Sequence, residues 1–471
     1  MVVCSVTETK ESLYKTYRIE MLRYLLISLT LIFSETFAIA SQNQPINTRN
    51  PVTALSGFGV NSMALWGGGS KTNPRQKSEF LSHYRPLEDF GITHVVLVSC
   101  ADWIIDISCK KDFQNLDGII TAAEILLNDT NLHIVIQLKA YKKTKVQGKN
   151  ISELNQRLET DSLAVKKFVE SWGVIAKELA DYQGERLSFN LLNEPEFQIP
   201  KPTKQRRDKW LNIAQQAAKK IRSETPERPI IIEGIAKSLF ARRLGNGNGY
   251  EYENPDELLT PINMDNIIYA FHNYEPEEFL QQSLERFGSF GRPYIEKYSD
   301  MVRLDAERAA NWSDKHEVPV MLTETGCIGF LKKIEGPKSN KDCGLFAEDI
   351  QENYIDRGIG VTWWALEKEK TIYNRDCSDN CWMPLRGSRP NAAIFNAFGL
   401  KIPKFEPIPL SKIKINELLK YDADFESCVK NEAKTLGISE AKISKTIKKA
   451  KSGKEKHIQK IKDLIVGGSC L

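Results

Sequence analysis

Eight short apolar runs, separated by intervals of helical length, constrain the fold of this chain of 471 residues more than any other feature. Each run is rich in Val, Ile, Leu or Phe, as buried parallel strands are, and the intervals carry helix-like apolar spacing. Eight strand–helix units predict a (β/α)₈ TIM barrel of the α/β class. An open doubly wound sheet is the alternative, although no glycine-rich phosphate turn follows the first run. The predicted strands are residues 56–61, 93–99, 133–139, 187–193, 229–234, 266–272, 318–323 and 360–365.

Two glutamates follow runs of this kind, at positions where barrel enzymes place their chemistry. Glu194 stands in Asn193-Glu194-Pro195 after the fourth run, and Glu324 stands in Thr323-Glu324-Thr325-Gly326 at the end of the seventh. Two carboxylates at one barrel mouth are what retaining cleavage of a glycosidic bond requires, one as acid/base and one as nucleophile. Asn193 offers an amide that suits the neighbouring sugar hydroxyl. Asn-Glu-Pro alone is also a common helix start, so the prediction depends on Glu194 and Glu324 taken together.

This arrangement resembles glycoside hydrolase family 5, the cellulase-type branch of the retaining barrel glycosidases, over roughly residues 52–400. The resemblance implies that Glu194 is the acid/base and Glu324 the nucleophile. His272 and Tyr274 match the family's His-x-Tyr after the sixth strand, whose side chains hold the substrate and the nucleophile. A structural histidine is the plain alternative for His272.

Trp363 and Trp364 lie where the family carries an aromatic platform for a sugar ring. Successive side chains of a strand face opposite ways, so we expect one indole to reach the sugar and the other to pack in the core. The chain also departs from the family. Val96 stands where an arginine is common in the second strand, and Lys139 follows the third strand where a histidine is common. Lys139 could restore a positive charge near Glu324.

The leading hypothesis is therefore retaining hydrolysis of a β-linked polysaccharide or oligosaccharide by Glu194 and Glu324, without a metal or organic cofactor. Lys139, Asn193, His272 and Tyr274 are expected to contact substrate, together with one of the two tryptophans. The alternative is a catalytically impaired barrel that binds glycans. A barrel lyase or phosphate enzyme is a third reading. It would need a metal cluster or a glycine-rich phosphate loop after the seventh or eighth strand, and the segment with Gly326 and Gly329 is a poor example of such a loop. We expect a monomer that does not bind nucleic acid.

The N-terminus predicts export. Arg23 precedes an apolar run over residues 24–33, and Ala38-Ile39-Ala40 has the small residues that a signal peptidase accepts. We expect a signal peptide over residues 1–40, with Met21 as an alternative start, and a secreted protein that is extracellular or periplasmic. The run is shorter than the roughly 20 residues that span a bilayer, which favours cleavage over an uncleaved tether.

Cysteine usage agrees with an oxidising compartment, because eight cysteines remain after residues 1–40 are removed. A zinc site is the rival reading, but the pair Cys377-x-x-x-Cys381 has no second close pair or nearby histidine. The simplest disulfide pairing joins neighbours in the sequence: Cys100 with Cys109, Cys327 with Cys343, Cys377 with Cys381, and Cys428 with Cys470.

Composition changes near residue 408, which divides the chain into a catalytic region, residues 41–407, and a Lys-rich helical region, residues 408–471. Residues 410–471 carry 14 Lys against 8 Asp or Glu, a formal charge of +6, so the rest of the chain has a charge of −2. Such a charge run is commonly a solvated helix face. The alternative is docking on an anionic surface of the cell envelope.

Overall fold

A computed structural model gives the fold of the chain, and the residues that it describes are 52–63, 74–109, 116–146, 149–195, 203–235, 242–243, 250–251, 255–257, 259–280, 293–327, 338–366, 373–374, 389–402, 419, 426, 429–431, 433–434 and 437–465. The predicted signal peptide, the region around residue 408 and the last four cysteines lie outside these residues. The descriptions below concern the described residues.

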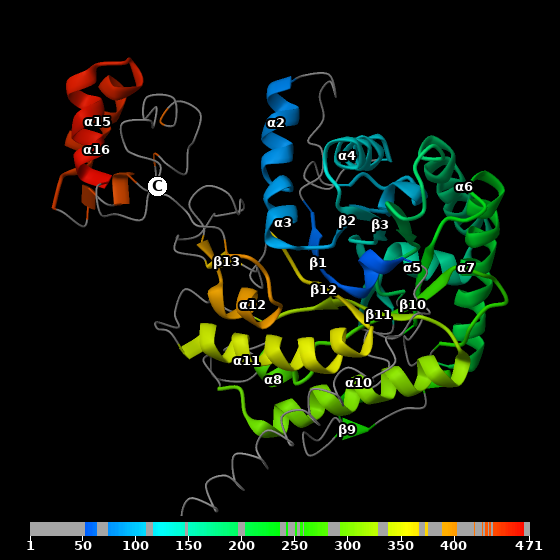
Figure 1. The fold of residues 1–471 in the computed structure, drawn as a ribbon. Helices are drawn as coiled ribbons and strands as arrows, with labels where there is room; N and C mark the ends of the chain where they lie inside the picture. Colours follow the sequence, from blue (N-terminus) through cyan, green and yellow to red (C-terminus); the bar gives the residue numbers. More distant parts are fainter. Residues whose placement is uncertain are drawn as a thin grey trace, which may run out of the picture. The chain divides into compact units, whose positions relative to one another are not determined.

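Eight parallel strands close into a barrel, in the order β1-β12-β11-β10-β7-β6-β3-β2, so the predicted TIM barrel is confirmed (Figure 1). Each strand falls within or beside one of the eight apolar runs of the sequence, with shorter bounds for several. The strands are β1 (Phe58–Ser62), β2 (His94–Cys100), β3 (His133–Lys139), β6 (Leu187–Asn190), β7 (Ile230–Glu233), β10 (Ile267–His272), β11 (Val320–Thr325) and β12 (Gly360–Trp363).

Helices follow the strands and are arranged around the barrel (Figure 1). Side chains cap several of them: Ser152 accepts a hydrogen bond at the start of α5, Asp161 at the start of α6 and Thr203 at the start of α7. The helices are α2 (Pro74–Ser82), α3 (Arg85–Phe90), α4 (Leu116–Asp129), α5 (Glu153–Thr160), α6 (Ser162–Glu178), α7 (Lys204–Glu224), α8 (Glu277–Leu280), α10 (Glu296–His316), α11 (Lys338–Asn353) and α12 (Ala392–Ala397).

Short elements occupy the connections between strands and helices. A hairpin of β4 (Lys143–Val146) and β5 (Lys149–Ser152) follows β3 and leads into α5. The remaining ones are the strand pairs β8 (Arg242–Arg243) with β9 (Tyr250–Glu251) and β13 (Tyr373–Asn374) with β14 (Arg389–Pro390), and the 3₁₀ turns η1 (Thr53–Ser56), η2 (Asp102–Ile105), η3 (Pro255–Glu257) and η4 (Ile355–Arg357).

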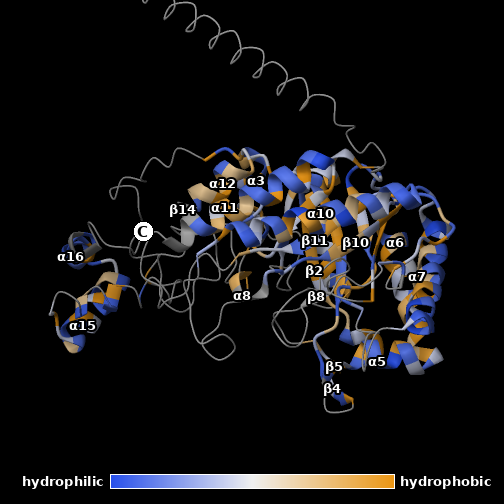
Figure 2. Ribbon diagram, turned by 90° about the horizontal axis from the view of Figure 1, so that it is seen from below, coloured by the Kyte–Doolittle hydropathy of each residue, from blue (hydrophilic) through white to orange (hydrophobic). Residues whose placement is uncertain are grey.

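Alternating side chains of the strands divide between two hydrophobic clusters. In β2, Val95 and Leu97 belong to the large cluster that packs the strands against the helices, whereas Val96 and Val98 belong to a smaller cluster with residues of the other strands. The smaller cluster therefore fills the barrel interior. Figure 2 shows the hydrophobic colour concentrated on strands such as β2, β10 and β11, while α7 is hydrophilic on its outer side.

A buried histidine closes the interior near the start of the strands. The Nε2 atom of His94 lies 2.9 Å from Oγ1 of Thr362, and its Nδ1 atom lies 3.1 Å from the carbonyl oxygen of Ala54. A side chain at Gly59 would place Cβ 2.2 Å from this ring, so the strand needs glycine there. The polar residues that end the strands, such as Lys139 and His272, lie at the opposite, carboxyl end of the barrel.

Two of the four predicted disulfides are confirmed, Cys100–Cys109 and Cys327–Cys343, with Cα atoms 6.1 and 5.7 Å apart. Cys100 is the last residue of β2, and Cys327 lies two residues after the end of β11. Each bond ties the loop that leaves a barrel strand at its carboxyl end. The other two predicted pairs lie outside the described residues.

The C-terminal region contains two described helices, α15 (Glu440–Lys451) and α16 (Glu455–Ile465). Their apolar residues, which include Ile443, Ile447 and Ile461, form a small cluster together with Leu419, Val429 and Ala433. This agrees with the prediction of a helical, Lys-rich extension. Among the helices that the structure describes, none combines the length and the apolar character that crossing a bilayer requires.

Candidate active site

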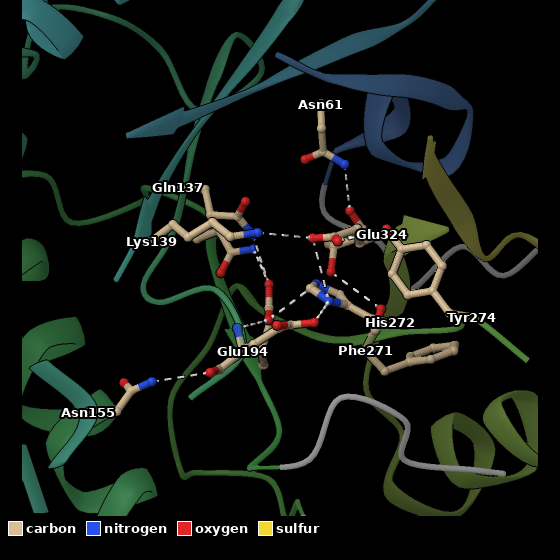
Figure 3. A network of polar contacts seen from close by, with 12 residues as sticks. Asn61, Gln137, Lys139, Asn155, Glu194, Phe271, His272, Tyr274 and Glu324 are labelled. Atoms are coloured by element: carbon tan, nitrogen blue, oxygen red, sulfur yellow. Dashed lines mark hydrogen bonds and ion pairs between the residues drawn. The ribbon is translucent and has the colours of Figure 1, made fainter. Parts of the chain in front are cut away.

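Polar side chains from several barrel strands and from the loops that follow them converge at the carboxyl end of the barrel (Figure 3). They include Lys139 at the end of β3, Glu194 after β6, His272 at the end of β10 and Glu324 in β11. Tyr274 follows β10 two residues after His272. The ends of parallel barrel strands share one opening, which is why residues far apart in the sequence meet there.

Glu194 stands on an unusual backbone. Its φ angle is +46°, in the left-handed region that residues other than glycine avoid. Hydrogen bonds hold this turn on both sides: the Glu194 N–H donates to Oε2 of Glu233 at 2.7 Å, and Nδ2 of Asn155 in α5 donates to the Glu194 carbonyl at 3.3 Å. The side chain of Glu194 is 14% exposed, so it remains accessible at the opening.

Glu324 owes its position to an irregular strand register. The pairing of β10 with β11 shifts between Phe271 and His272, which sets His272 beside Glu324. The Tyr274 hydroxyl donates to Oε1 of Glu324 at 2.7 Å, and Nζ of Lys139 lies 3.9 Å from Oε2. Oε2 is buried and has no hydrogen-bond partner among the described residues. Tyr274 therefore fixes Oε1 of Glu324, whereas Oε2 can accept a hydrogen bond from a ligand.

His272 lies between three carboxylates. Its Nδ1 atom is 3.1 Å from Oε1 of Glu194 and 3.6 Å from Oε2 of Glu324, and its Nε2 atom is 3.3 Å from Oε2 of Glu233. Burial by itself lowers the pKa of His272, but the negative charges of Glu233 and Glu324 and the close contacts with Glu194 and Glu233 outweigh it. The pKa of His272 therefore lies well above its ordinary value, and Nδ1 of the protonated ring donates to Glu194.

One carboxylate oxygen of Glu194, one of Glu324 and a ring nitrogen of His272 all lie within 4.8 Å of one another. Three such atoms could surround a cation. A protonated imidazole has no free lone pair for a metal, however, and a hydrogen bond to Glu194 already engages Nδ1. The set therefore fits a pair of carboxyl groups that act together on a bound molecule better than it fits metal binding.

Trp363 and Trp364 point to opposite sides of the strand, as successive residues of a strand do. Trp363 is fully buried and packs against Phe58, Phe346 and Phe398, so of the two indoles it is the one that packs in the core. Trp364 belongs to the interior cluster, and Nζ of Lys139 lies 4.3 Å from the centre of its ring. Trp364 thus borders the same positive charge as Glu324.

Asn193 is buried, and its backbone N–H donates to the carbonyl of Leu138 at 2.8 Å. Its side-chain Oδ1 has no hydrogen-bond partner among the described residues. Asn61 in β1 reaches past β12 to strand β11, because its Nδ2 donates to the carbonyl of Thr323 at 3.1 Å. Val96 lies in the interior cluster and pairs with Val135, four residues before Lys139, so it is deeper in the barrel than the charges at the opening.

Sequence reasoning gave no role to Glu233, Gln137 or Asn190, which the structure joins beneath the opening. Oε1 of Glu233 accepts hydrogen bonds from Nε2 of Gln137 at 2.9 Å and from Nδ2 of Asn190 at 2.8 Å. The available signal was the placement of a carboxylate at the end of the apolar run Ile230–Glu233. A polar side chain at the end of a barrel strand can lie at the opening or point into the barrel interior. Glu233 points into the interior.

Comparisons with known proteins agree on one family. The family model described as Cellulase (glycosyl hydrolase family 5) matches residues 84–370. Endoglucanase C of Acetivibrio thermocellus is 31% identical in an alignment of 243 positions that covers 45% of this chain and 62% of that protein. Endoglucanase 3 of Fibrobacter succinogenes is 31% identical over 121 residues, 25% of this chain and 16% of that protein. The chain therefore spans less than two thirds of the length of either relative.

Solved structures share the fold at low sequence identity. Thermotoga maritima Cel5A in complex with a mannotriose substrate matches with a TM-score of 0.51 and 19% identity, covering 75% of this chain and 99% of that one. The cellulose synthase subunit Z of Clostridioides difficile matches with a TM-score of 0.50 and 18% identity, covering 73% of this chain and 99% of that one. These likenesses support the barrel and its extent.

We expect His272 to remain an imidazolium at neutral pH. Because its pKa is raised, the stabilisation from its charge is complete below about pH 6.5 and is lost as the pH rises through the raised value. Histidine side-chain NMR over a pH series measures this. His94 and His133 are internal controls, since burial lowers their pKa values to about 3 and about 4 and both should stay neutral. A neutral His272 ring at pH 6 would contradict the expectation.

Proposed function

Since the chain belongs to glycosyl hydrolase family 5, the cellulase family, we propose that it is a retaining glycoside hydrolase that acts on a β-linked glucan or a related β-linked polysaccharide. The observation that carries the proposal is the approach of Glu194 and Glu324, whose carboxylate oxygens lie within 4.8 Å of each other. Retaining enzymes place the two carboxyl groups about 5 Å apart, whereas inverting enzymes separate them by about 6.5–9.5 Å to admit a water. The names of the curated relatives, both endoglucanases, support the substrate class.

In the first step, Oε2 of Glu324 attacks the anomeric carbon while Glu194 donates its proton to the departing glycosidic oxygen. Tyr274 holds Oε1 of the nucleophile at 2.7 Å, which leaves Oε2 directed to the substrate. The result is a glycosyl ester on Glu324. In the second step, Glu194 accepts a proton from water, the water oxygen attacks the same carbon, and the carboxylate of Glu324 leaves.

The other residues of the site bind and orient the substrate in this proposal. The indole of Trp364 suits the apolar face of a pyranose ring. The unpaired Oδ1 of Asn193 accepts a hydrogen bond from a sugar hydroxyl next to the reacting carbon. Lys139 supplies positive charge beside both Trp364 and Glu324. The reaction in this form needs no metal or organic cofactor.

The alternative function is glycan binding without catalysis. It draws on Val96, which puts an apolar side chain where the family commonly has a positive one. Both functions require a sugar-binding opening, so binding assays alone do not separate them. Turnover assays do separate them, because only the enzyme uses the two carboxylates to cleave the bound glycan.

Export and a separate role for the C-terminal region complete the proposal. The signal-like residues 1–40 and the two disulfides fit an oxidising compartment outside the cytoplasm. We propose that residues 41–407 act as a monomeric catalytic region and that the C-terminal helices attach it to an anionic envelope polymer. Partial burial and the charges of Lys449, Lys460, Lys454 and Lys456 lower the pKa of His457, which marks a concentrated positive surface.

Glu324→Ala should lower kcat on an aryl β-cellobioside by at least about 10⁴-fold, because it removes the nucleophile. Added azide should restore part of the rate and give a glycosyl azide. Glu194→Ala should lower kcat by about 10²–10⁴-fold on a substrate with a poor leaving group, and less on an activated one. Equal, negligible turnover by the wild type and both variants on a panel of β-glucans and β-mannans would favour the glycan-binding alternative.

Lys139→Met tests whether Lys139 replaces the missing positive partner of the nucleophile. Without a cation 3.9 Å from Oε2, Glu324 should ionise less readily, so the acid limb of the pH–rate profile should move to higher pH and kcat should fall about 10-fold. Lys139→Arg is the matched control that keeps the charge. An unchanged rate and acid limb in Lys139→Met would show that no such compensation exists.

Replacing Lys449, Lys454, Lys456 and Lys460 with glutamine should release the protein from a polyanionic resin such as polygalacturonate. Wild-type binding should fall steeply between about 0.05 M and about 0.5 M NaCl. Four lysines replaced on α6 and α7, namely Lys166, Lys204, Lys209 and Lys219, make the control. Salt-independent retention, or retention of the quadruple variant, would contradict the docking.

The exported protein in the same preparation should begin near Ser41.

A further inference from the structure

Glu233 is the third carboxylate in contact with His272, and the reaction proposed above gives it no role. It is 2% exposed and ends strand β7. Its two oxygens receive three hydrogen bonds: Oε1 accepts from Gln137 and Asn190, and Oε2 accepts from the Glu194 N–H at 2.7 Å. Nε1 of Trp210 in α7 also donates to the Glu233 carbonyl at 2.8 Å, which fixes the end of the strand.

A buried carboxylate needs a cation or several donors to offset its lost hydration. Within 4 Å of Glu233, His272 is the cationic group that the described part of the chain provides, with Nε2 at 3.3 Å. The opposite side of the same ring faces Glu194 and Glu324. The charge on Glu233 therefore acts on a ring that touches both members of the reacting pair.

The contact with the Glu194 backbone is the second link. A left-handed conformation is unfavourable for a residue with a side chain. A hydrogen bond from that residue's N–H to an ionised oxygen is stronger than one to a neutral oxygen and offsets this cost. The same Oε2 atom of Glu233 therefore holds the Glu194 turn and approaches Nε2 of His272.

We propose that Glu233 is a positioning residue of the active site, which fixes the turn that carries Glu194 and keeps His272 a cation between Glu194 and Glu324. Glu233 touches no substrate. It acts through the backbone N–H of Glu194 and the ring of His272. The first contact fixes the position of Glu194, and the second maintains the charge of His272. The inference rests on the proposed function, because the roles of Glu194 and Glu324 belong to that proposal.

A pH signature follows from the groups that face His272. They are Glu233 from β7, Glu194 after β6 and Glu324 from β11, with Lys139 from β3 beyond Glu324. Neutralising Glu233 removes one of the charges that raise the pKa of His272. The ring then loses its proton at lower pH, so the alkaline limb of activity should move down. A carboxylate that served only for packing would leave this limb unchanged.

The experiment compares Glu233→Gln with Glu233→Asp. The glutamine removes the charge and brings an N–H₂ group toward existing donors; the aspartate keeps the charge but shortens the reach to Glu194. In Glu233→Gln, the His272 titration measured by NMR should fall by at least about one pH unit. In both variants, kcat on an aryl β-cellobioside should fall about 10–100-fold with KM changed less than about 3-fold, since no substrate contact is lost.

Asp305→Asn is the matched control. Asp305 is a buried acid bonded to Asn273 and Tyr354, and among the described residues no hydrogen bond or ion pair joins it to His272. Replacing it should leave the His272 titration in place, which separates the contact between Glu233 and His272 from the general cost of altering a buried acid. If Glu233→Gln does not fold, Glu233→Asp decides: a lowered kcat with His272 still protonated supports positioning.

An unchanged His272 titration and pH profile in Glu233→Gln, or an unchanged kcat in Glu233→Asp, would overturn the inference. These failures differ from a failure of the proposed function. That proposal falls if Glu324→Ala retains turnover, and the His272 titration, which does not depend on turnover, still reports on Glu233 in that case.

Discussion

A buried imidazolium shared among three carboxylates is the interaction on which the rest of the site depends. Glu194, Glu233 and Glu324 come from three different strands or their loops, and like charges at such distances repel strongly in a medium of low dielectric constant. The cation at His272 makes their proximity tolerable, and Lys139 adds a second positive charge at the open side.

Much of this arrangement could be read from the sequence. The eight apolar runs predict the barrel, and the barrel alone brings strand-end residues as distant as Lys139, Glu194, His272 and Glu324 to one opening. The sequence also predicts that Trp363 and Trp364 face opposite sides. It could not tell which of them packs outward, because that depends on the register shift between β11 and β12.

Other features depend on backbone detail that no pattern encodes. The left-handed turn at Glu194 exists because Glu233 and Asn155 bond to its two sides, and these residues lie 39 positions away in either direction. The bulge between Phe271 and His272 decides that the ring lies beside Glu324. Glu233 was visible at the end of an apolar run, but its inward direction became clear only with the strand register.

The Cys327–Cys343 bond bears on how the protein can be made. Cys327 follows Glu324 by three residues and joins the loop of the seventh barrel strand to helix α11. A chain synthesised in a reducing cytosol lacks this disulfide next to Glu324, and it lacks the Cys100–Cys109 disulfide as well. Recombinant production therefore calls for periplasmic targeting or for refolding in a glutathione redox buffer, and thiol reductants should be left out of every purification step.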